Sequence, residues 1–293
     1  MRWVGEVMSD RVAACALKIC LIVFCGFVIA FGQSSQPDNA AKEAIARAQA
    51  AYLKKDFALA KRELESALAI KKDLAEPHLL LGMIARREGK IDAAIKSVRE
   101  AIKYQPNYPE AHFVMGGLYF EKRDWKRAEE EANLALSQDA KLANAYALLG
   151  DIALAREQYE PAVKFFEQAS TQSPPNGEVT NETRIKMEAV KNYVEFQANK
   201  KNKDFQAPKI AVRGPIPRLG TPRQSEVKLA GIVNEQGRFT PILVLYASDQ
   251  EAEEIYLKYV TGIQFTPAKR NGAPVLIWQW MEFKTSVGVQ VVR

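Results

Sequence analysis

Histidine and cysteine are scarce in this sequence, and their scarcity limits the chemistry that the chain can carry. It has 2 histidines and 3 cysteines, and all of the cysteines precede residue 32. Metal centres need several converging ligands, and covalent catalysis needs a nucleophile next to a base. The rest of the chain offers no cysteine nucleophile, no glycine-rich phosphate loop and no Ser/His/Asp set beyond chance spacing. We therefore expect no enzyme, no metal and no cofactor.

A net positive charge is also missing from most of the chain. Residues 200–228 hold eight basic and two acidic side chains, so this segment alone matches the formal net charge of +6. A nucleic-acid-binding protein needs its basic side chains on a folded face. Proline and glycine interrupt this segment, which predicts a basic, Pro-rich linker over residues 203–225 and no nucleic-acid partner.

A repeated pattern fills the middle of the chain. Gly82, Gly116 and Gly150 are 34 residues apart and open similar segments. Alanines recur at two further positions of each copy, at Ala60, Ala94, Ala128 and Ala162, and at Ala67, Ala101, Ala135 and Ala169. Such a period predicts paired helices with small residues where their backbones approach. The copies span residues 41–74, 75–108, 109–142 and 143–176.

The period and these small residues resemble the tetratricopeptide repeat family over residues 41–176. The resemblance implies an α-solenoid whose concave face, lined by the first helix of each pair, binds an extended or helical segment of a protein partner. The alternative is that these side chains only pack against one another. The predicted partner-binding groove comprises Tyr52, Leu79, Met83, Arg86, Arg87, Phe113, Phe120 and Leu154.

Two features at the margins of the repeats have simple structural interpretations. His78 and His112 occupy the same repeat position, so we interpret them as packing residues rather than as a metal pair. A capping helix is predicted over residues 180–202, because Ile185, Ala189, Tyr193 and Phe196 form one apolar stripe.

The first 32 residues resemble an export signal. Basic residues precede an apolar run that ends in Ala30-Phe31-Gly32, the pattern of a signal peptide. Cleavage before Gln33 would leave a periplasmic chain without cysteine. The alternative is an inner-membrane anchor formed by residues 13–31, with Lys18 reaching the interface.

The last part of the chain changes from a helical to a strand pattern. We predict strands at residues 227–233 and 239–247, then a helix opened by a capping box at Ser248 and Glu251, then a long strand over residues 274–287. This is a small α+β domain of order β-β-α-β over residues 226–293.

These segments resemble the C-terminal domain of TonB-family proteins. The motifs are Val227-x-Leu229 with Val233 and Gly237, and Phe265-x-Pro-Ala followed by Asn271-Gly-x-Pro. The resemblance implies a domain that adds an extended peptide of an outer-membrane protein to a sheet edge. The histidine-bearing membrane helix and the long Pro-rich spacer of the energy transducers are both missing.

Alternation in the last strand directs Leu276, Trp278 and Trp280 to one face. In a three-stranded sheet this face would meet solvent. Either the linker covers it, or the face is a strand-docking edge or a dimer surface formed by this domain.

Three functions remain open from the sequence. The first is an exported adaptor of a bacterial cell envelope that binds partners through the groove and the sheet edge. The second is a membrane-anchored energy transducer that acts on outer-membrane transport. The third is an envelope assembly factor that uses the repeats alone.

Overall fold

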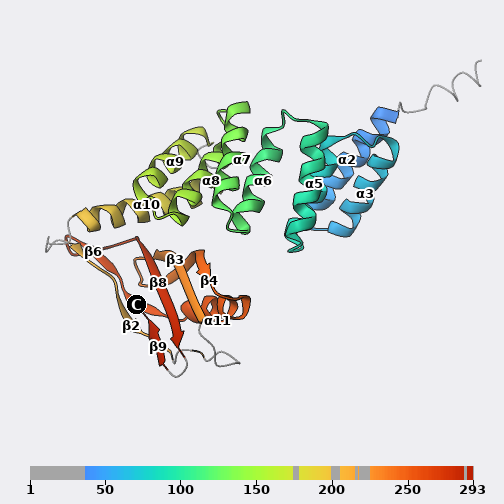
Figure 1. The fold of residues 1–293 in the computed structure, drawn as a ribbon. Coiled ribbons are helices and arrows are strands. Elements are labelled where there is room, and N and C mark those ends of the chain that lie inside the picture. The colour runs from blue at the N-terminus through green and yellow to red at the C-terminus, as the bar shows by residue number, and fades with distance from the viewer. Residues whose placement is uncertain are drawn as a thin grey trace, which may run out of the picture. The chain divides into compact units, whose positions relative to one another are not determined.

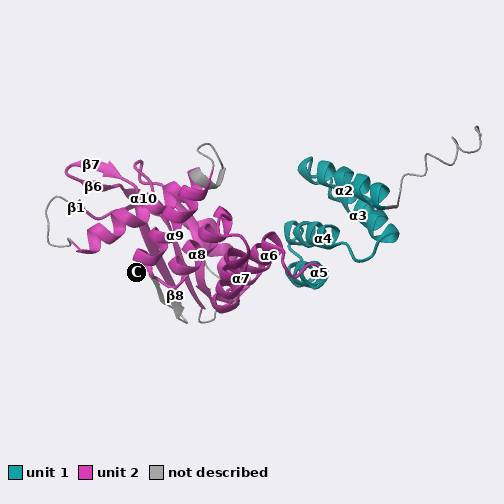
Figure 2. Ribbon diagram, turned by 90° about the horizontal axis from the view of Figure 1, so that it is seen from above, with its two compact units in different colours: residues 1–104 teal, residues 105–293 magenta. Residues whose placement is uncertain are grey.

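The computed structural model describes residues 37–173, 178–198, 205–214, 217, 225–286 and 289–292. The chain divides into two compact units, residues 1–104 and 105–293 (Figure 2). The predicted signal peptide or anchor, with its three cysteines, lies outside the described residues. In the described part of the chain, the helices are all too short or too polar to cross a membrane.

The first unit contains two helix pairs. Its helices are α2 Pro37–Leu53, α3 Phe57–Ile70, α4 Ala75–Arg87 and α5 Ile91–Tyr104. The alanines of the second helices, Ala60, Ala67, Ala94 and Ala101, have no exposed surface. A Cβ added to Gly82 would lie 2.5 Å from Cγ2 of Val98, so α4 and α5 approach closely there. The predicted role of the small residues is confirmed.

The second unit begins with two more pairs and a longer helix. These are α6 Pro109–Glu121, α7 Trp125–Gln138, α8 Ala143–Ala155, α9 Tyr159–Gln172 and α10 Glu178–Ala198. Gly116 and Gly150 again face the second helix of their pair, next to the Ala128 carbonyl and the Phe166 ring. The described residues thus contain eight helices, α2–α9, arranged as four consecutive pairs.

The turn inside each pair has one residue in the left-handed region. These residues are Lys55, Gly89, Arg123 and Glu157, with φ of 61°, 74°, 59° and 59°. In each turn the amide of this residue donates to the carbonyl three residues earlier, and the next amide donates to the carbonyl five residues earlier. Because only one of the four is glycine, the sequence pattern gave little sign of this turn.

Helix α10 follows the last repeat and contacts α9, α8 and strand β8 (Figure 1). The predicted apolar stripe is correct for Ala189, which is fully buried, but wrong for Ile185, which is 42% exposed. The buried face instead includes Lys186, Val190 and Asn192. This face accepts polar residues because they have partners, as described below.

The C-terminal part contains one helix and several strands. Its main sheet has the order β4-β3-β8-β9 with antiparallel neighbours. The bounds are β3 Ser225–Val233, β4 Phe239–Ala247, α11 Gln250–Val260, β8 Ile277–Ser286 and β9 Val289–Val292. One apolar cluster, which includes Leu229, Tyr256 and Phe283, joins the sheet to α11. The strand-strand-helix-strand order is confirmed.

Two local predictions in this part are wrong, and one strand was not predicted. The cap of α11 is Asp249, whose carboxylate accepts from the Ala252 amide, so the helix begins one residue later than a Ser248 cap implies. The predicted long strand is divided into β7 Ala273–Val275 and β8. The chain then folds back as β9, whose valines favour a strand.

Part of the predicted linker is also strand. β1 Phe205–Gln206 pairs with β6 Ala268–Arg270, which pairs in turn with β7. β2 Lys209–Val212 pairs with β5 Gln264–Thr266. The Phe205 side chain is 9% exposed, and it anchors this segment in the same cluster as α11. The aromatic and β-branched residues therefore outweigh the nearby prolines over residues 205–212.

Candidate interaction surfaces

In the first unit, the predicted groove residues divide into core and surface. Leu79 is 5% exposed and packs in the core, so its assignment to the groove is wrong. Tyr52 and Met83 are half-buried, whereas Arg86 and Arg87 are exposed at the end of α4. The Tyr52 ring packs against Phe57, with 5.8 Å between the ring centroids. This face of the first unit, Tyr52, Met83, Arg86 and Arg87, is called the basic face below.

An acidic residue next to the basic face is already engaged. The Glu88 carboxylate accepts from Lys61 Nζ at 2.5 Å and from Lys90 Nζ at 3.0 Å. These two hydrogen bonds, first that of Lys61 and then that of Lys90, hold the pKa of Glu88 below its usual value. Glu88 therefore stays ionised and paired with the two lysines.

In the second unit, the equivalent positions are covered by the sheet. Leu154 is 1% exposed and shares an apolar cluster with Ile232, Leu243 and Trp278 of the three strands. Phe120 is half-buried, packs against that cluster and contacts Trp125, with ring centroids 5.0 Å apart. Phe113 is half-buried. Leu154 is therefore not open to a partner, and its predicted place in an open groove is wrong.

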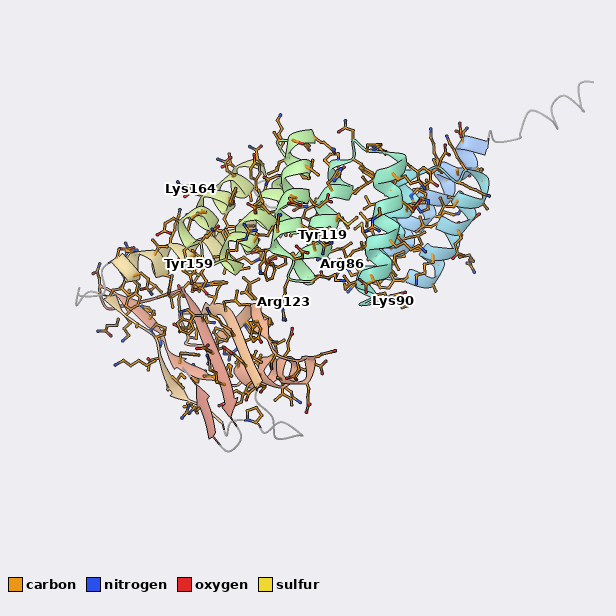
Figure 3. All side chains as sticks on the ribbon, in the orientation of Figure 1. Arg86, Lys90, Tyr119, Arg123, Tyr159 and Lys164 are labelled. Carbon is orange, nitrogen blue, oxygen red and sulfur yellow. The ribbon has the colours of Figure 1, made fainter. Side chains whose placement is uncertain are left out.

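Ion pairs join the two left-handed turns of the second unit to the C-terminal domain. Arg123 donates to Glu253 of α11 at 2.5 Å, and Glu157 accepts from Lys228 of β3. Figure 3 labels Arg123, in the turn after α6, on the side of the helices that faces the strands. Arg270 also pairs with Glu195 of α10 at 2.8 Å. Arg123 and Glu157, which occupy the same position in consecutive repeats, thus hold the C-terminal domain at two points.

A buried ion pair ties α10 to the last repeat. Lys186 Nζ lies 2.9 Å from Asp151 and 2.7 Å from Glu182. Burial alone would lower the pKa of Lys186, but the carboxylates of Asp151 and Glu182 raise it above its usual value. Asp151 stands at the position that Met83 holds in the first unit. The capping helix α10 therefore supplies the counter-ion of Asp151.

Next to this pair, two tyrosines connect α9 with α10. The rings of Tyr159 and Tyr193 have centroids 4.7 Å apart. Burial, and then the neighbouring Tyr193, raises the pKa of Tyr159. The phenol therefore stays neutral, and the two rings pack α9 against α10.

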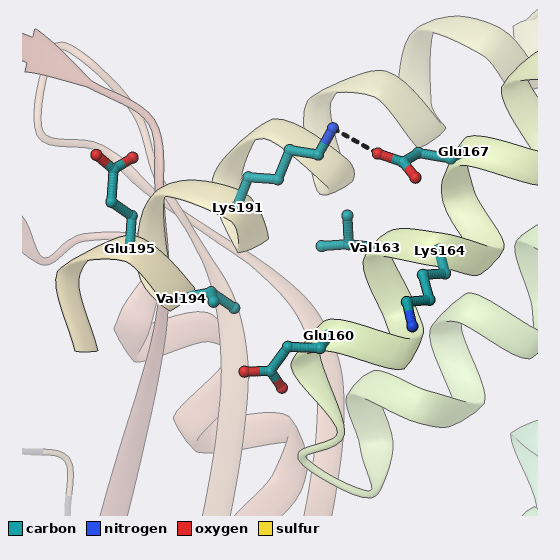
Figure 4. A pocket seen from close by; sticks show the side chains of 7 residues that line it. All are labelled: Glu160, Val163, Lys164, Glu167, Lys191, Val194 and Glu195. Carbon is teal, nitrogen blue, oxygen red and sulfur yellow. Dashed lines mark ion pairs between the residues drawn. The ribbon is translucent and has the colours of Figure 1, made fainter. Parts of the chain in front are cut away.

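A small groove lies between α9 and α10 (Figure 4). Its volume is about 340 Å³, and Val163 and Val194 contribute its apolar lining. Lys191 and Glu167 pair at 2.7 Å across it. The lining also includes Glu160, Lys164 and Glu195, so the charges are mixed. The groove suits one inserted apolar side chain and has no marked preference for charge.

The two histidines are packing residues in equivalent sites. The Nε2 atoms of His78 and His112 lie 3.4 Å and 3.2 Å from the carbonyl oxygens of Lys72 and Pro106, respectively. His78 stacks on Tyr104, and His112 contacts Glu131 at 2.7 Å. Among the described residues, no group of three or more metal-ligating side chains converges. The carbonyl partners explain both rings without a ligand.

The predicted strand-docking edge differs from what the alternation suggested. Trp278 is 1% exposed, Leu276 and Trp280 are half-buried, and the Leu276 carbonyl accepts from Asn192 of α10 at 2.7 Å. β8 has β3 along one side and β9 along Phe283–Ser286 on the other. The tryptophan face is covered by the repeats and α10, an alternative that the sequence did not suggest, so Trp278 cannot select a guest strand.

One edge strand of the sheet is β4, and it is poorly suited to pairing. Pro241 lacks an amide donor, and the pairing with β3 shifts register twice. Prolines and bulges on an edge strand oppose further strand addition.

Comparison with known proteins supports the repeats. Two family models, both described as tetratricopeptide repeat, match residues 85–152 and 143–176. RNA polymerase II-associated protein 3 of Mus musculus is 31% identical over 98 residues, which are 33% of this chain and 15% of that protein. The chain thus spans only a small part of this curated relative. Residues 85–176 thus match tetratricopeptide repeat models, and proteins with such repeats mediate protein–protein interactions.

Solved structures show limited similarity. The structure of Pseudomonas aeruginosa pilF has a TM-score of 0.49 with 18% identity, and covers 56% of this chain and 71% of that chain. The first TPR of Spaghetti (RPAP3) bound to the HSP90 peptide SRMEEVD has a TM-score of 0.35 with 28% identity, and covers 38% of this chain and 89% of that chain.

Proposed function

We propose that this chain is a non-enzymatic adaptor that binds protein partners through the basic face of its first unit. The observation that carries the proposal is the contrast between equivalent repeat positions. Arg86 is exposed, whereas Leu154, at the same position two repeats later, is buried under the sheet. Repeats 1 and 2 therefore keep the surface that repeats 3 and 4 use internally.

The chemistry of the basic face defines the guest. Tyr52 and Met83 give a half-buried apolar floor, and Arg86 and Arg87 give positive charge. Arginine forms paired hydrogen bonds with carboxylates, and an apolar side chain would cover the tyrosine and methionine. The proposed guest is an extended segment of a partner protein that carries one apolar side chain close to a carboxylate.

A peptide array can test this proposal. Octapeptides with a central leucine and zero to three glutamates would be probed with the full chain, with Arg87→Glu and with Lys96→Glu. Lys96 is exposed on α5, the second helix of repeat 2, so it is a control with the same charge change. We expect the glutamate-containing peptides to bind, Arg87→Glu to abolish binding and Lys96→Glu to keep it. No selective binding, or equal losses in both variants, would contradict the proposal.

A finer proposal places the adaptor in a bacterial envelope after export. It is supported by the basic, apolar and small residues in positions 1–32. N-terminal sequencing of the mature protein tests it, and we expect a start at Gln33. A full-length chain in the membrane fraction would favour the alternative of an anchored energy transducer, because only an anchored chain can transmit force from the inner membrane.

The TonB-like interpretation of the C-terminal domain is a further part of this proposal. It is supported by the order β3, β4, α11, β8 along the chain and by the antiparallel sheet that these three strands share. A guest strand would pair with the part of β8 that precedes Phe283, since β9 pairs only with Phe283–Ser286. Backbone hydrogen bonds would hold it, without a contribution from Trp278.

A further inference from the structure

The C-terminal sheet takes part in two separate apolar clusters. One face packs on α11 in the cluster that includes Val227, Leu229 and Phe283. The opposite face, with Ala230, Ile232 and Trp278, packs against repeat 4 and α10. Since successive residues of a strand point to opposite faces, the two clusters are built from alternate positions of β3. The buried residues of the first cluster thus come mainly from the C-terminal strands and α11, while Tyr193 and Phe196 of α10 pack against its margin.

The contact with the repeats has the anatomy of a protein–protein interface. Its centre is apolar and includes Leu154, Leu243 and Trp278, which are 1%, 7% and 1% exposed. Its margin is polar: the side chains of Arg123 and Glu253 are 30% and 28% exposed. An apolar centre within a partly hydrated polar margin is typical of surfaces that associate.

The repeats meet the sheet with the positions that the first unit leaves open. Phe120 and Leu154 correspond to Tyr52 and Arg86, and the turn residues Arg123 and Glu157 correspond to Lys55 and Gly89. Corresponding residues differ in chemistry. Phe120 and Leu154 are apolar where Arg86 is charged, and Arg123 and Glu157 have charged partners in the C-terminal domain where Gly89 has no side chain. The surface of repeats 3 and 4 is therefore fitted to one particular occupant.

We propose that the C-terminal sheet is an intramolecular ligand of repeats 3 and 4. It occupies their first-helix face, releases it as a folded body together with α11, and closes it to any other partner while docked. The inference deepens the proposed function, because it confines external ligands to the first unit until the sheet is released. The repeat face of the second unit is fitted to the apolar face of an antiparallel sheet with complementary charges at Glu253 and Lys228.

Thiol labelling in the full chain can test this inference. In a background with Cys15, Cys20 and Cys25 replaced by serine, Leu243→Cys reports exposure of the docked face. Leu118→Cys, in the fully buried core of α6, reports unfolding of the repeats, and Leu229→Cys reports unfolding of the domain itself. Release of a folded body exposes only the first site. We expect Leu243→Cys to react at least about tenfold faster than the two controls, with a weaker dependence on urea.

Charge reversal then tests the docking contacts. Glu253→Lys should speed the labelling of Leu243→Cys by about two- to fivefold without changing the two controls, because it breaks one partly exposed ion pair. Adding Arg123→Glu should restore the original rate. Glu254→Lys, at an exposed position of the same helix, should leave it unchanged.

Two results would overturn the inference. Equal rates and equal urea dependence at all three cysteines would make the sheet a permanent part of one core. If Arg123→Glu does not reverse the effect of Glu253→Lys, the Arg123–Glu253 ion pair is not part of the docking contact. The assay contains no partner, so its outcome does not depend on whether the basic face binds peptides.

Discussion

Replacement of Gly150 by alanine tests the helix packing most directly. A Cβ at this position would lie 2.3 Å from Cε1 and 2.5 Å from Cδ1 of Phe166, whose side chain has no exposed surface. Carbon atoms make favourable contact only at about 3.5–4.0 Å, so the ring must move within a closed cluster. Gly116 differs, because the closest atom to its added Cβ is the tip of Leu148 at 3.0 Å, and a leucine can rotate.

The magnitudes decide the sign of each effect. Overpacking of a filled core costs about 1–3 kcal/mol, whereas removing a glycine from a helix interior returns about 1 kcal/mol. Because the Phe166 ring is enclosed, the clash should exceed this gain, and we expect Gly150→Ala to lower the free energy of unfolding by up to about 2 kcal/mol. Gly116→Ala should change it by less than about 1 kcal/mol, since the gain in helix propensity offsets most of a milder clash. The bulkier Gly116→Leu should cost about 1–3 kcal/mol.

Urea unfolding followed by far-UV circular dichroism measures these differences. The exposed Glu130→Ala is the control and should stay within about 0.5 kcal/mol of the wild type. Phe166→Leu in the Gly150→Ala background should relieve the clash, with a coupling of about 0.5–3 kcal/mol between the two sites. A Gly150→Ala protein as stable as the wild type, or a double mutant with no coupling, would refute the close approach of α8 and α9.

Three further predictions concern the turns, the buried ion pair and the tryptophans. Lys55→Gly should stabilise the chain by about 0.5–1 kcal/mol in thermal unfolding, and Gly89→Ala should destabilise it, because both positions have positive φ. Lys186→Met should cost about 3–5 kcal/mol by leaving Asp151 buried and unpaired, and Asp151→Leu should restore much of this loss. Because folding raises the pKa of Lys186, the contribution of this lysine to stability should be complete below its unfolded pKa of about 10.4. It should be lost as the pH rises through the folded pKa. Urea unfolding between pH 8 and pH 12, compared with the Lys186→Met and Asp151→Leu double mutant, measures this loss. Trp278→Ala should lower stability by about 3–5 kcal/mol and Trp280→Ala by clearly less, because only Trp278 is fully buried.

The repeats could be predicted from the sequence because their tightest contacts admit few residue types. Gly116 and Ala128 stand where two backbones approach, so glycine and alanine recur at a fixed period. The left-handed turns escaped prediction for the opposite reason. Their conformation is fixed by two backbone hydrogen bonds in each turn, and lysine, arginine and glutamate tolerate it at Lys55, Arg123 and Glu157.

The groove was predicted only in part, because repeat phase assigns positions and not their neighbours. The same phase places Arg86 and Leu154 on the first-helix face, yet one is exposed and the other is covered. The difference in side-chain chemistry was visible in the sequence, but its cause lies more than 70 residues further along the chain, in Ile232 and Trp278. Contacts of that sequence separation leave no periodic signal.

The tryptophans of β8 show how two incomplete surfaces could have been matched. The alternation of Trp278 and Trp280 predicted an apolar face without a cover, and the apolar residues Phe120 and Leu154 predicted a groove without a ligand. Each surface alone favours an external partner. In the second unit the two apolar surfaces pack against each other. The ion pairs Arg123–Glu253 and Glu157–Lys228 add complementary charges to this contact. This match concerns the second unit alone, and the proposed external partner is therefore assigned to the basic face of the first unit.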